Sequence, residues 1–64
     1  MKENYSNYDS WDYMMSDALT YLQDIMIREI DIVDKEGTLY VEFQIWAYDP
    51  QQMEEVQLHY FIRA

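Results

Sequence analysis

The stretch TLYVEFQIWAY, residues 38–48, decides the fold expected for this chain. β-Branched and aromatic residues dominate it, and no Gly or Pro interrupts it, which is typical of a β-strand. Side chains alternate between the two faces of a strand. One face is apolar and holds Leu39, Val41, Phe43, Ile45 and Ala47, whereas the other holds Tyr40, Glu42, Gln44, Trp46 and Tyr48. We therefore predict a central strand with one core face and one surface face.

A hairpin is expected to join this strand to a strand over about 27–33. The sequence DKEG, residues 34–37, separates the two, and Gly37 is the only glycine in the chain. A four-residue loop with Gly37 in the left-handed conformation pairs Val33 with Thr38. This register places the apolar residues of both strands on one face, whereas a slip of one residue would bury a charge.

A third strand is expected over about 56–63, after a turn or one short helix at 49–55. Its side chains alternate again, and Val56 opposite Ala47 keeps the apolar residues of both strands on one face. The other face then carries Phe61 among polar residues.

The segment before the hairpin has helical spacing from about 10 to 25. Apolar residues recur three and four positions apart and form one stripe: Trp11, Met14, Met15, Ala18, Leu19, Leu22, Ile25 and Met26. Residues 1–8 are polar and are expected to be a lead-in without regular structure. The fold class is α+β, with residues 1–64 as a single domain in which one N-terminal helix packs on a three-stranded antiparallel meander (α-β-β-β). The residues expected to be buried are Trp11, Leu22, Val41, Phe43, Ile45 and Leu58.

Net charge is the most informative feature of the composition. Thirteen acids against four bases give −9 on 64 residues. Such a surface repels nucleic acid and anionic membranes and attracts basic partners, although solubility alone is the simpler explanation. Hydrophobic residues make up 50% of the chain, which is too many for a disordered segment. We predict a folded, cytoplasmic protein, because the chain shows no signal peptide and no membrane span, and Cys is absent.

Candidate catalytic and metal-binding residues are few. Acids flank Gly37, but Val33 and Lys35 occupy positions where a calcium loop that starts at Asp31 needs oxygen ligands. His59 is the only His, and on the expected strand it has no partner Cys, second His or evident base. The serines lie near the helix start, where capping explains them. We therefore expect no enzyme activity, no cofactor and no metal.

The outer face of the expected sheet is the better candidate for a binding site. Aromatic side chains there alternate with polar ones, and exposed aromatic clusters usually mark an interface. Two alternatives remain: residues 1–8 fold over this face, or the domain forms a homodimer through it. Trp46 is predicted to be a contact residue rather than a core residue. The predicted contacts on this face are Tyr40, Glu42, Trp46, Tyr48 and Phe61.

Size, acidity, the helix WDYMMSDALTYLQD (11–24) and the outer face of TLYVEFQIWAY (38–48) together resemble a class of proteins. The chain resembles the small acidic inhibitors that phages and mobile elements encode, among them DNA mimics and anti-CRISPR proteins. The resemblance implies inhibition of a nucleic-acid-binding protein or defence nuclease complex through its basic surface, without direct contact to nucleic acid. An antitoxin, an immunity protein or an adaptor that binds through the aromatic face is the alternative. The helix residues expected to contact a basic groove are Asp9, Asp12, Tyr13, Asp17 and Asp24.

Overall fold

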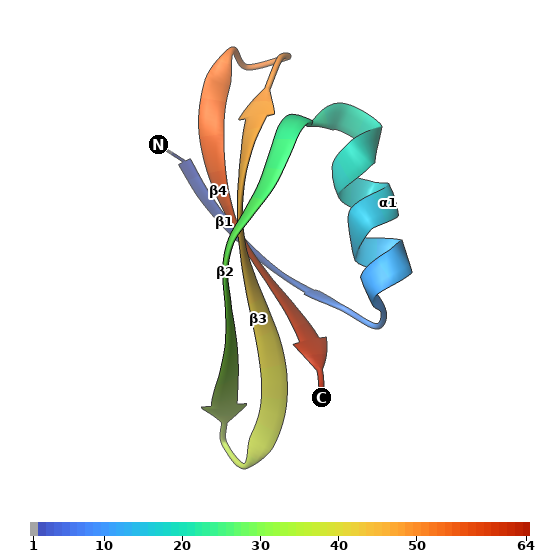
Figure 1. The fold of residues 1–64 in the computed structure, drawn as a ribbon, viewed down its shortest axis with the longest axis vertical. Helices are drawn as coiled ribbons and strands as arrows, with labels where there is room; N and C mark the ends of the chain where they lie inside the picture. Colours follow the sequence, from blue (N-terminus) through green and yellow to red (C-terminus); the bar gives the residue numbers. More distant parts are fainter. Residues whose placement is uncertain (1) are drawn as a thin grey trace.

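The computed structural model describes residues 2–64, with the side chain of Leu19 excepted. The elements are β1 (Lys2–Tyr8), α1 (Trp11–Tyr21), β2 (Gln23–Lys35), β3 (Thr38–Asp49) and β4 (Glu54–Arg63). The strands form one mixed sheet in the order β1-β4-β3-β2, with α1 on one side of it (Figure 1). The predicted α+β class is confirmed. The predicted three-stranded antiparallel meander is wrong, because a fourth strand lies parallel to β4.

Strand β1 corrects the expectation that residues 1–8 lack regular structure. It lies along β4, with Tyr5 opposite His59 and Tyr8 opposite Ile62. Tyr8 also packs edge-on against Tyr60, with ring centroids 4.8 Å apart. The strand was missed because neither of its faces is apolar, so its sequence lacks the alternation of apolar and polar residues that marks a strand.

Helix α1 starts where predicted and ends four residues early. The Oγ atom of Ser10 caps it by accepting a hydrogen bond from the backbone N–H of Tyr13 at 3.2 Å. Leu22 is already extended, with φ −109° and ψ 156°, and Asp24 has φ 55°. The β-branched residues that follow favour a strand. The predicted helix over 10–25 is therefore too long at its C-terminal end.

The β2–β3 hairpin has a tighter turn than the predicted loop at 34–37. Lys35, rather than Val33, lies opposite Thr38. Glu36 (φ 51°) and Gly37 (φ 86°) form a two-residue turn with two positive φ angles, the type that matches the twist of a hairpin. The left-handed Gly37 is confirmed, and the register differs from the prediction by two residues. A shift of two keeps the side chains of 29–35 on their predicted face, whereas the irregularity between Ile27 and Glu29 places Ile27 opposite Ile45 and Met26 opposite Trp46.

The β3–β4 pairing has the predicted register. Ala47 lies opposite Val56, and the rest of the ladder follows in step. The connection is a turn in which Asp49 Oδ1 accepts hydrogen bonds from the backbone N–H groups of Gln51 at 3.0 Å and Gln52 at 3.3 Å. Alternation on both strands was clear enough in the sequence to fix this pairing.

The core lies between α1 and the inner face of the sheet, the face toward the helix. Its buried residues are Met14, Ala18, Leu22, Ile45, Ala47, Val56, Leu58 and Tyr60. Val41 and Phe43 are only half-buried. Several predictions of burial are wrong: Trp11, at the start of α1, is 41% exposed on the rim of the core, Met26, beyond the helix end, is 56% exposed, and Leu39 on the predicted core face of β3 is 50% exposed. Leu19 of the predicted stripe lies outside the described side chains.

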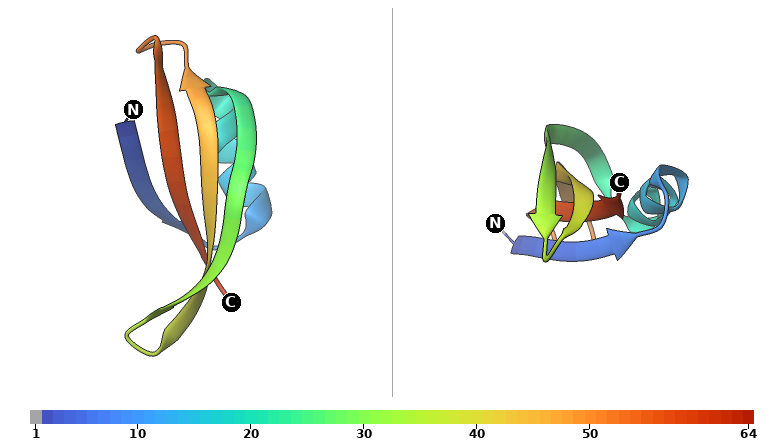
Figure 2. Two further views of the ribbon diagram at one scale, coloured as in Figure 1. Left: turned by 60° about the vertical axis from the view of Figure 1, so that its left-hand side comes forward. Right: turned by 90° about the horizontal axis from the view of Figure 1, so that it is seen from below.

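The helix covers only one half of the inner face. At 1.5 Å per residue α1 is about 16 Å long, whereas the 13 residues of β2 extend on the order of 40 Å. Figures 1 and 2 show the β2–β3 hairpin running well beyond the helix. We call the part of the inner face under α1 the covered half. The part formed by Ile30, Ile32, Leu39, Val41 and Phe43 is called the uncovered half.

Candidate functional site

The acidic residues predicted to contact a basic groove from one helix lie in three different segments of the chain. Asp9 precedes α1, and Asp24 belongs to β2. Asp12 and Asp17 are in α1, but a separation of five residues turns them about 140° apart around the axis. All four are exposed, as is Tyr13. The expectation that all four acids belong to one helix is therefore wrong, although each residue remains accessible to a partner.

Asp17 has a partner within the protein. Its Oδ2 atom accepts a hydrogen bond from the Tyr8 hydroxyl at 2.5 Å. Burial, and then this hydrogen bond, raises the pKa of Tyr8 to about 12. The contact ties α1 to β1, so Asp17 helps to hold the structure together and is less free than Asp12 to meet a partner.

The aromatic side chains on the outer face of the sheet are less exposed than the sequence indicated. Tyr40, Trp46 and Tyr48 are half-buried there, and Phe61 is only 6% exposed. The expectation that Phe61 is exposed is wrong. The Nζ atom of Lys35 lies 3.3 Å from the centroid of the Phe61 ring and 5.7 Å from that of Tyr40. This ammonium covers the aromatic rings by cation–π contact.

The same face holds a His with two carboxylate partners. His59 Nδ1 lies 2.9 Å from Glu42 Oε2, and His59 Nε2 lies 2.9 Å from Glu3 Oε1. The Tyr5 ring stacks on the imidazole at a centroid distance of 4.2 Å and an angle of 9°. The interpretation of His59 as a residue without partners is therefore wrong. It missed the cluster because Glu3 and Tyr5 come from β1, which the sequence did not predict.

The His59 cluster acts as a clamp between three strands. Burial lowers the pKa of His59, but its hydrogen bonds to Glu42 and Glu3 outweigh burial and raise the pKa above the ordinary value of 6.5. The imidazolium has an N–H donor for each carboxylate, whereas neutral imidazole has one donor only. The two nitrogens serve different carboxylates, and no group of three His, Asp or Glu side chains within residues 2–64 is arranged to hold a metal ion.

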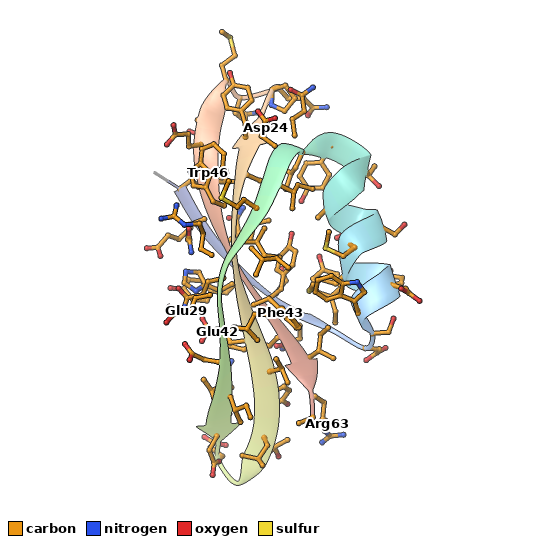
Figure 3. All side chains as sticks on the ribbon, viewed as in Figure 1. Asp24, Glu29, Glu42, Phe43, Trp46 and Arg63 are labelled. Carbon is orange, nitrogen blue, oxygen red and sulfur yellow. The ribbon has the colours of Figure 1, made fainter. Side chains whose placement is uncertain are left out.

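Figure 3 shows how the sheet divides these side chains between its two faces. Glu29, Glu42 and Trp46 point away from α1, whereas Phe43 points toward it. Glu42 has little surface left for a partner molecule, since its side chain is 14% exposed and accepts a hydrogen bond from His59. Glu29 on the edge strand β2 is exposed. The predicted aromatic contact residues on this face that retain partial exposure beside β2 are Tyr40, Trp46 and Tyr48.

Most of the acidic charge is not neutralised within the protein. Across residues 2–64, no Lys or Arg forms an ion pair with an acid, and the ion pairs present are those of His59. Asp34 and Asp49 accept only backbone N–H groups. The acids that form no side-chain hydrogen bond or ion pair with residues 2–64 are Asp9, Asp12, Asp24, Glu29, Asp31, Glu36, Glu54 and Glu55.

The uncovered half of the inner face is the apolar surface that the sequence did not reveal. Ile32 is 73% exposed, Ile30 55% and Leu39 50%. The sequence predicted core for this whole face, because alternation shows which side chains share a face but not how far a helix reaches along it. The helix length was the available signal, because a helix rises only about 1.5 Å per residue and a strand about 3.3 Å.

Comparison of the chain with protein-family models, curated proteins and solved structures gives no match. Within residues 2–64, no helix is both long enough and apolar enough to cross a membrane. The candidate site thus consists of two surface features: exposed carboxylates that lack internal partners, and the uncovered half of the inner face.

Proposed function

We propose that this protein is a small acidic binding protein that inhibits a nucleic-acid-binding protein, or a defence nuclease complex, by occupying its basic surface. It acts in the cytoplasm by binding rather than by catalysis, as an anti-CRISPR protein or DNA mimic does. The observation that supports this proposal is the set of exposed carboxylates without Lys or Arg partners. Such groups remain available to the side chains of another molecule.

Electrostatics gives the proposal its physical basis. Proteins that bind nucleic acid neutralise phosphates with Lys and Arg. A carboxylate that meets an Arg at a desolvated interface makes a strong, charge-assisted hydrogen bond. The field of a −9 protein also steers it toward a basic surface and raises the association rate at low salt.

Edge strand β2 offers carboxylates at a spacing related to that of DNA. Glu29 lies opposite Gln44, and Asp31 lies opposite Glu42, so both acids belong to the outer face. Alternate residues on a strand are about 6.6 Å apart. Phosphates on one DNA strand rise about 3.4 Å each along the axis, so the two acids present negative charge at a spacing of the same order.

A protein-interaction module, such as an antitoxin, an immunity protein or an adaptor, is the second candidate. One observation favours it: the exposed apolar residues of the uncovered half, with Ile32 73% exposed. Binding dominated by apolar contact depends little on salt, whereas binding dominated by exposed charges weakens as salt rises. Salt dependence therefore distinguishes the two candidates.

The test is capture of host-cell proteins on the immobilised protein after nuclease treatment of the lysate. We expect nucleic-acid-binding proteins to be retained at low salt, and to be released by added duplex DNA or RNA. Retention of proteins that neither nucleic acid nor high salt releases would contradict the proposal and favour the interaction module.

Three charge-reversal variants locate the contact. Glu29→Lys with Asp31→Lys changes β2, Asp9→Lys with Asp12→Lys changes the start of α1, and Glu54→Lys with Glu55→Lys changes the start of β4. Each pair of substitutions changes the net charge by the same amount. A difference in capture between the pairs therefore reports a local contact rather than the long-range electrostatic field of the protein. We expect the β2 pair to reduce capture most. Equal capture by all three variants and the parent would rule out carboxylate mimicry.

A further inference from the structure

The uncovered half of the inner face is continuous rather than a set of isolated residues. Ile32 lies opposite Val41, and Ile30 lies opposite Phe43, all on the same face of the sheet. The ring of Trp11 extends this surface to the start of α1, with its centroid 5.0 Å from that of Phe43. Contiguous exposed apolar surface on a small soluble domain usually marks a binding site.

Charge around this apolar surface is mainly acidic. Asp34 lies opposite Leu39 at its lower end, and Glu36 follows in the turn. Asp12 is next to Trp11 at the upper end and is exposed. Of the bases near this surface, Lys35 is held over the Phe61 ring on the outer face, and Arg63 lies opposite Tyr40 at the end of β4. A partner with positive charge beside its own apolar surface therefore fits here.

Addition of a strand to the free edge of β2 is the less favourable way to cover this surface. The β2–β3 ladder is irregular between Ile27 and Glu29, and β2 carries charged side chains along its length. Both features are known to discourage edge-to-edge pairing. Packing of a second copy is opposed by the −9 charge that each protomer carries.

The sheet already shows which element fits its inner face, because α1 packs on the covered half through Met14, Ala18 and Leu22. The strand length left beyond α1 is on the order of 20 Å, enough for about three to four helical turns. We infer that the uncovered half docks an amphipathic helix of a partner protein, with aliphatic residues on its apolar stripe and Lys or Arg beside it. This inference rests on the proposed function for the basic character of the partner.

The probe that tests this inference is a 14-residue peptide of Leu and Lys whose leucines recur with helical period. A peptide of the same composition in strict alternation carries equal charge but cannot form the same apolar stripe as a helix. We expect the helical peptide to bind more tightly and to shift the backbone amide signals of 30–43 in nuclear magnetic resonance spectra. Equal affinity for both peptides would overturn the inference.

Matched variants locate the contact on one face of the sheet. The double variant Ile32→Thr with Leu39→Thr should lower the affinity for the helical peptide by about tenfold or more, because two exposed aliphatic side chains are lost from the contact. Met26→Thr is the control, since Met26 is 56% exposed but lies on the outer face of β2, opposite Trp46. Thr retains strand propensity, and Ile32→Thr alone serves if the double variant is unstable. A larger loss from Met26→Thr would overturn the inference and favour the outer face.

The outcomes separate this inference from the proposed function. If the Thr variants bind the peptide as the parent does, while nucleic acid still displaces captured proteins, the docking surface is wrong and the proposed function stands. If the Thr variants no longer bind the peptide but nucleic acid displaces none of the captured proteins, the docking surface stands and the proposed function fails. A parent dimer that Ile32→Thr with Leu39→Thr dissociates would show a second copy as the occupant, and would overturn the inference.

Discussion

The covered and uncovered halves of the inner face are built from the same strands with different outcomes. Ile45 of β3 is fully buried under α1, whereas Ile32 of the neighbouring strand β2 is 73% exposed. Both lie on the same face and have the same side chain. The difference is the reach of an 11-residue helix along strands of 12 and 13 residues.

This difference separates two roles of apolar residues in a small protein. In the covered half they exchange water for close packing, which is the main source of folding free energy. In the uncovered half Ile30, Ile32 and Leu39 keep much of their contact with water and contribute little to folding. Their exposure is explained if another molecule covers them, as we propose.

The largest expected effect comes from truncating the same side chain in both halves. Ile45→Ala should lower the free energy of unfolding by about 2–5 kcal/mol, because it leaves a cavity in the core. Ile32→Ala should change it by about 0.5 kcal/mol or less, as is usual for exposed positions. Urea unfolding measures both. Similar losses at the two positions would contradict the division of the inner face.

A smaller effect is expected at the tip of the hairpin. Gly37 has φ 86°, and a Cβ atom there would have no neighbour within 4 Å, so the cost of Gly37→Ala is backbone strain of about 1–2 kcal/mol. Gly37→Asn should cost less, because Asn tolerates the left-handed region better. Thermal unfolding measures both variants. An unchanged melting temperature in Gly37→Ala would show that the hairpin tip unfolds separately from the covered half.

The two edges of the sheet should differ in their response to pH. The folded pKa of His59 is raised above 6.5, so its clamp on β1 is complete below about 6.5 and is lost as pH rises through the folded value. Stability should fall across that window, and amide exchange in β1, corrected for intrinsic rate, should increase there while β2 changes little. Glu3→Gln should lower the pKa of His59 and flatten this dependence. A pKa of His59 below 6.5 by nuclear magnetic resonance titration would contradict the clamp.

The smallest expected effect concerns the contact between β1 and α1. Tyr8 ionises near 12 in the folded protein and near 10 when unfolded, so its contribution to stability falls as pH rises through that interval. Tyr8→Phe should reduce the loss of stability in alkali without abolishing it, because burial also raises the pKa of Tyr60. Tyr13→Phe is the control, since Tyr13 is 67% exposed. Alkaline unfolding curves that are the same for Tyr8→Phe and Tyr13→Phe would show that Tyr8 has no such role.

The sequence was most informative where apolar alternation was strong. It predicted the β3–β4 register, including Ala47 opposite Val56, because both strands show one purely apolar or nearly apolar face. It placed the β2–β3 register two residues away, because such a shift preserves the faces and only the geometry of the turn at Gly37 decides between them. Strand β1 has no apolar face, so nothing in its pattern indicated a strand.

The candidate site was harder to predict for related reasons. His59 and Glu42 were on the expected outer face, but their cluster requires Glu3 from the missed strand β1. Phe61 was expected to be exposed, and only the three-dimensional course of the hairpin brings Lys35 over its ring. The uncovered half lies beyond the start of α1, where Trp11 contacts Phe43, and the sequence did not indicate how far the β2–β3 hairpin continues past that point.

The most direct measurement of the central claim is attenuation of methyl signals by a soluble paramagnetic agent, with and without the helical Leu–Lys peptide. In the free protein, the methyl groups of Ile30, Ile32 and Leu39 should be strongly attenuated, whereas that of Ile45 should be protected. The peptide should restore the first three signals and leave Ile45 unchanged. Protection of Ile32 in the free protein would contradict the uncovered half, and full attenuation of Ile32 in the presence of saturating peptide would contradict its role as a docking surface.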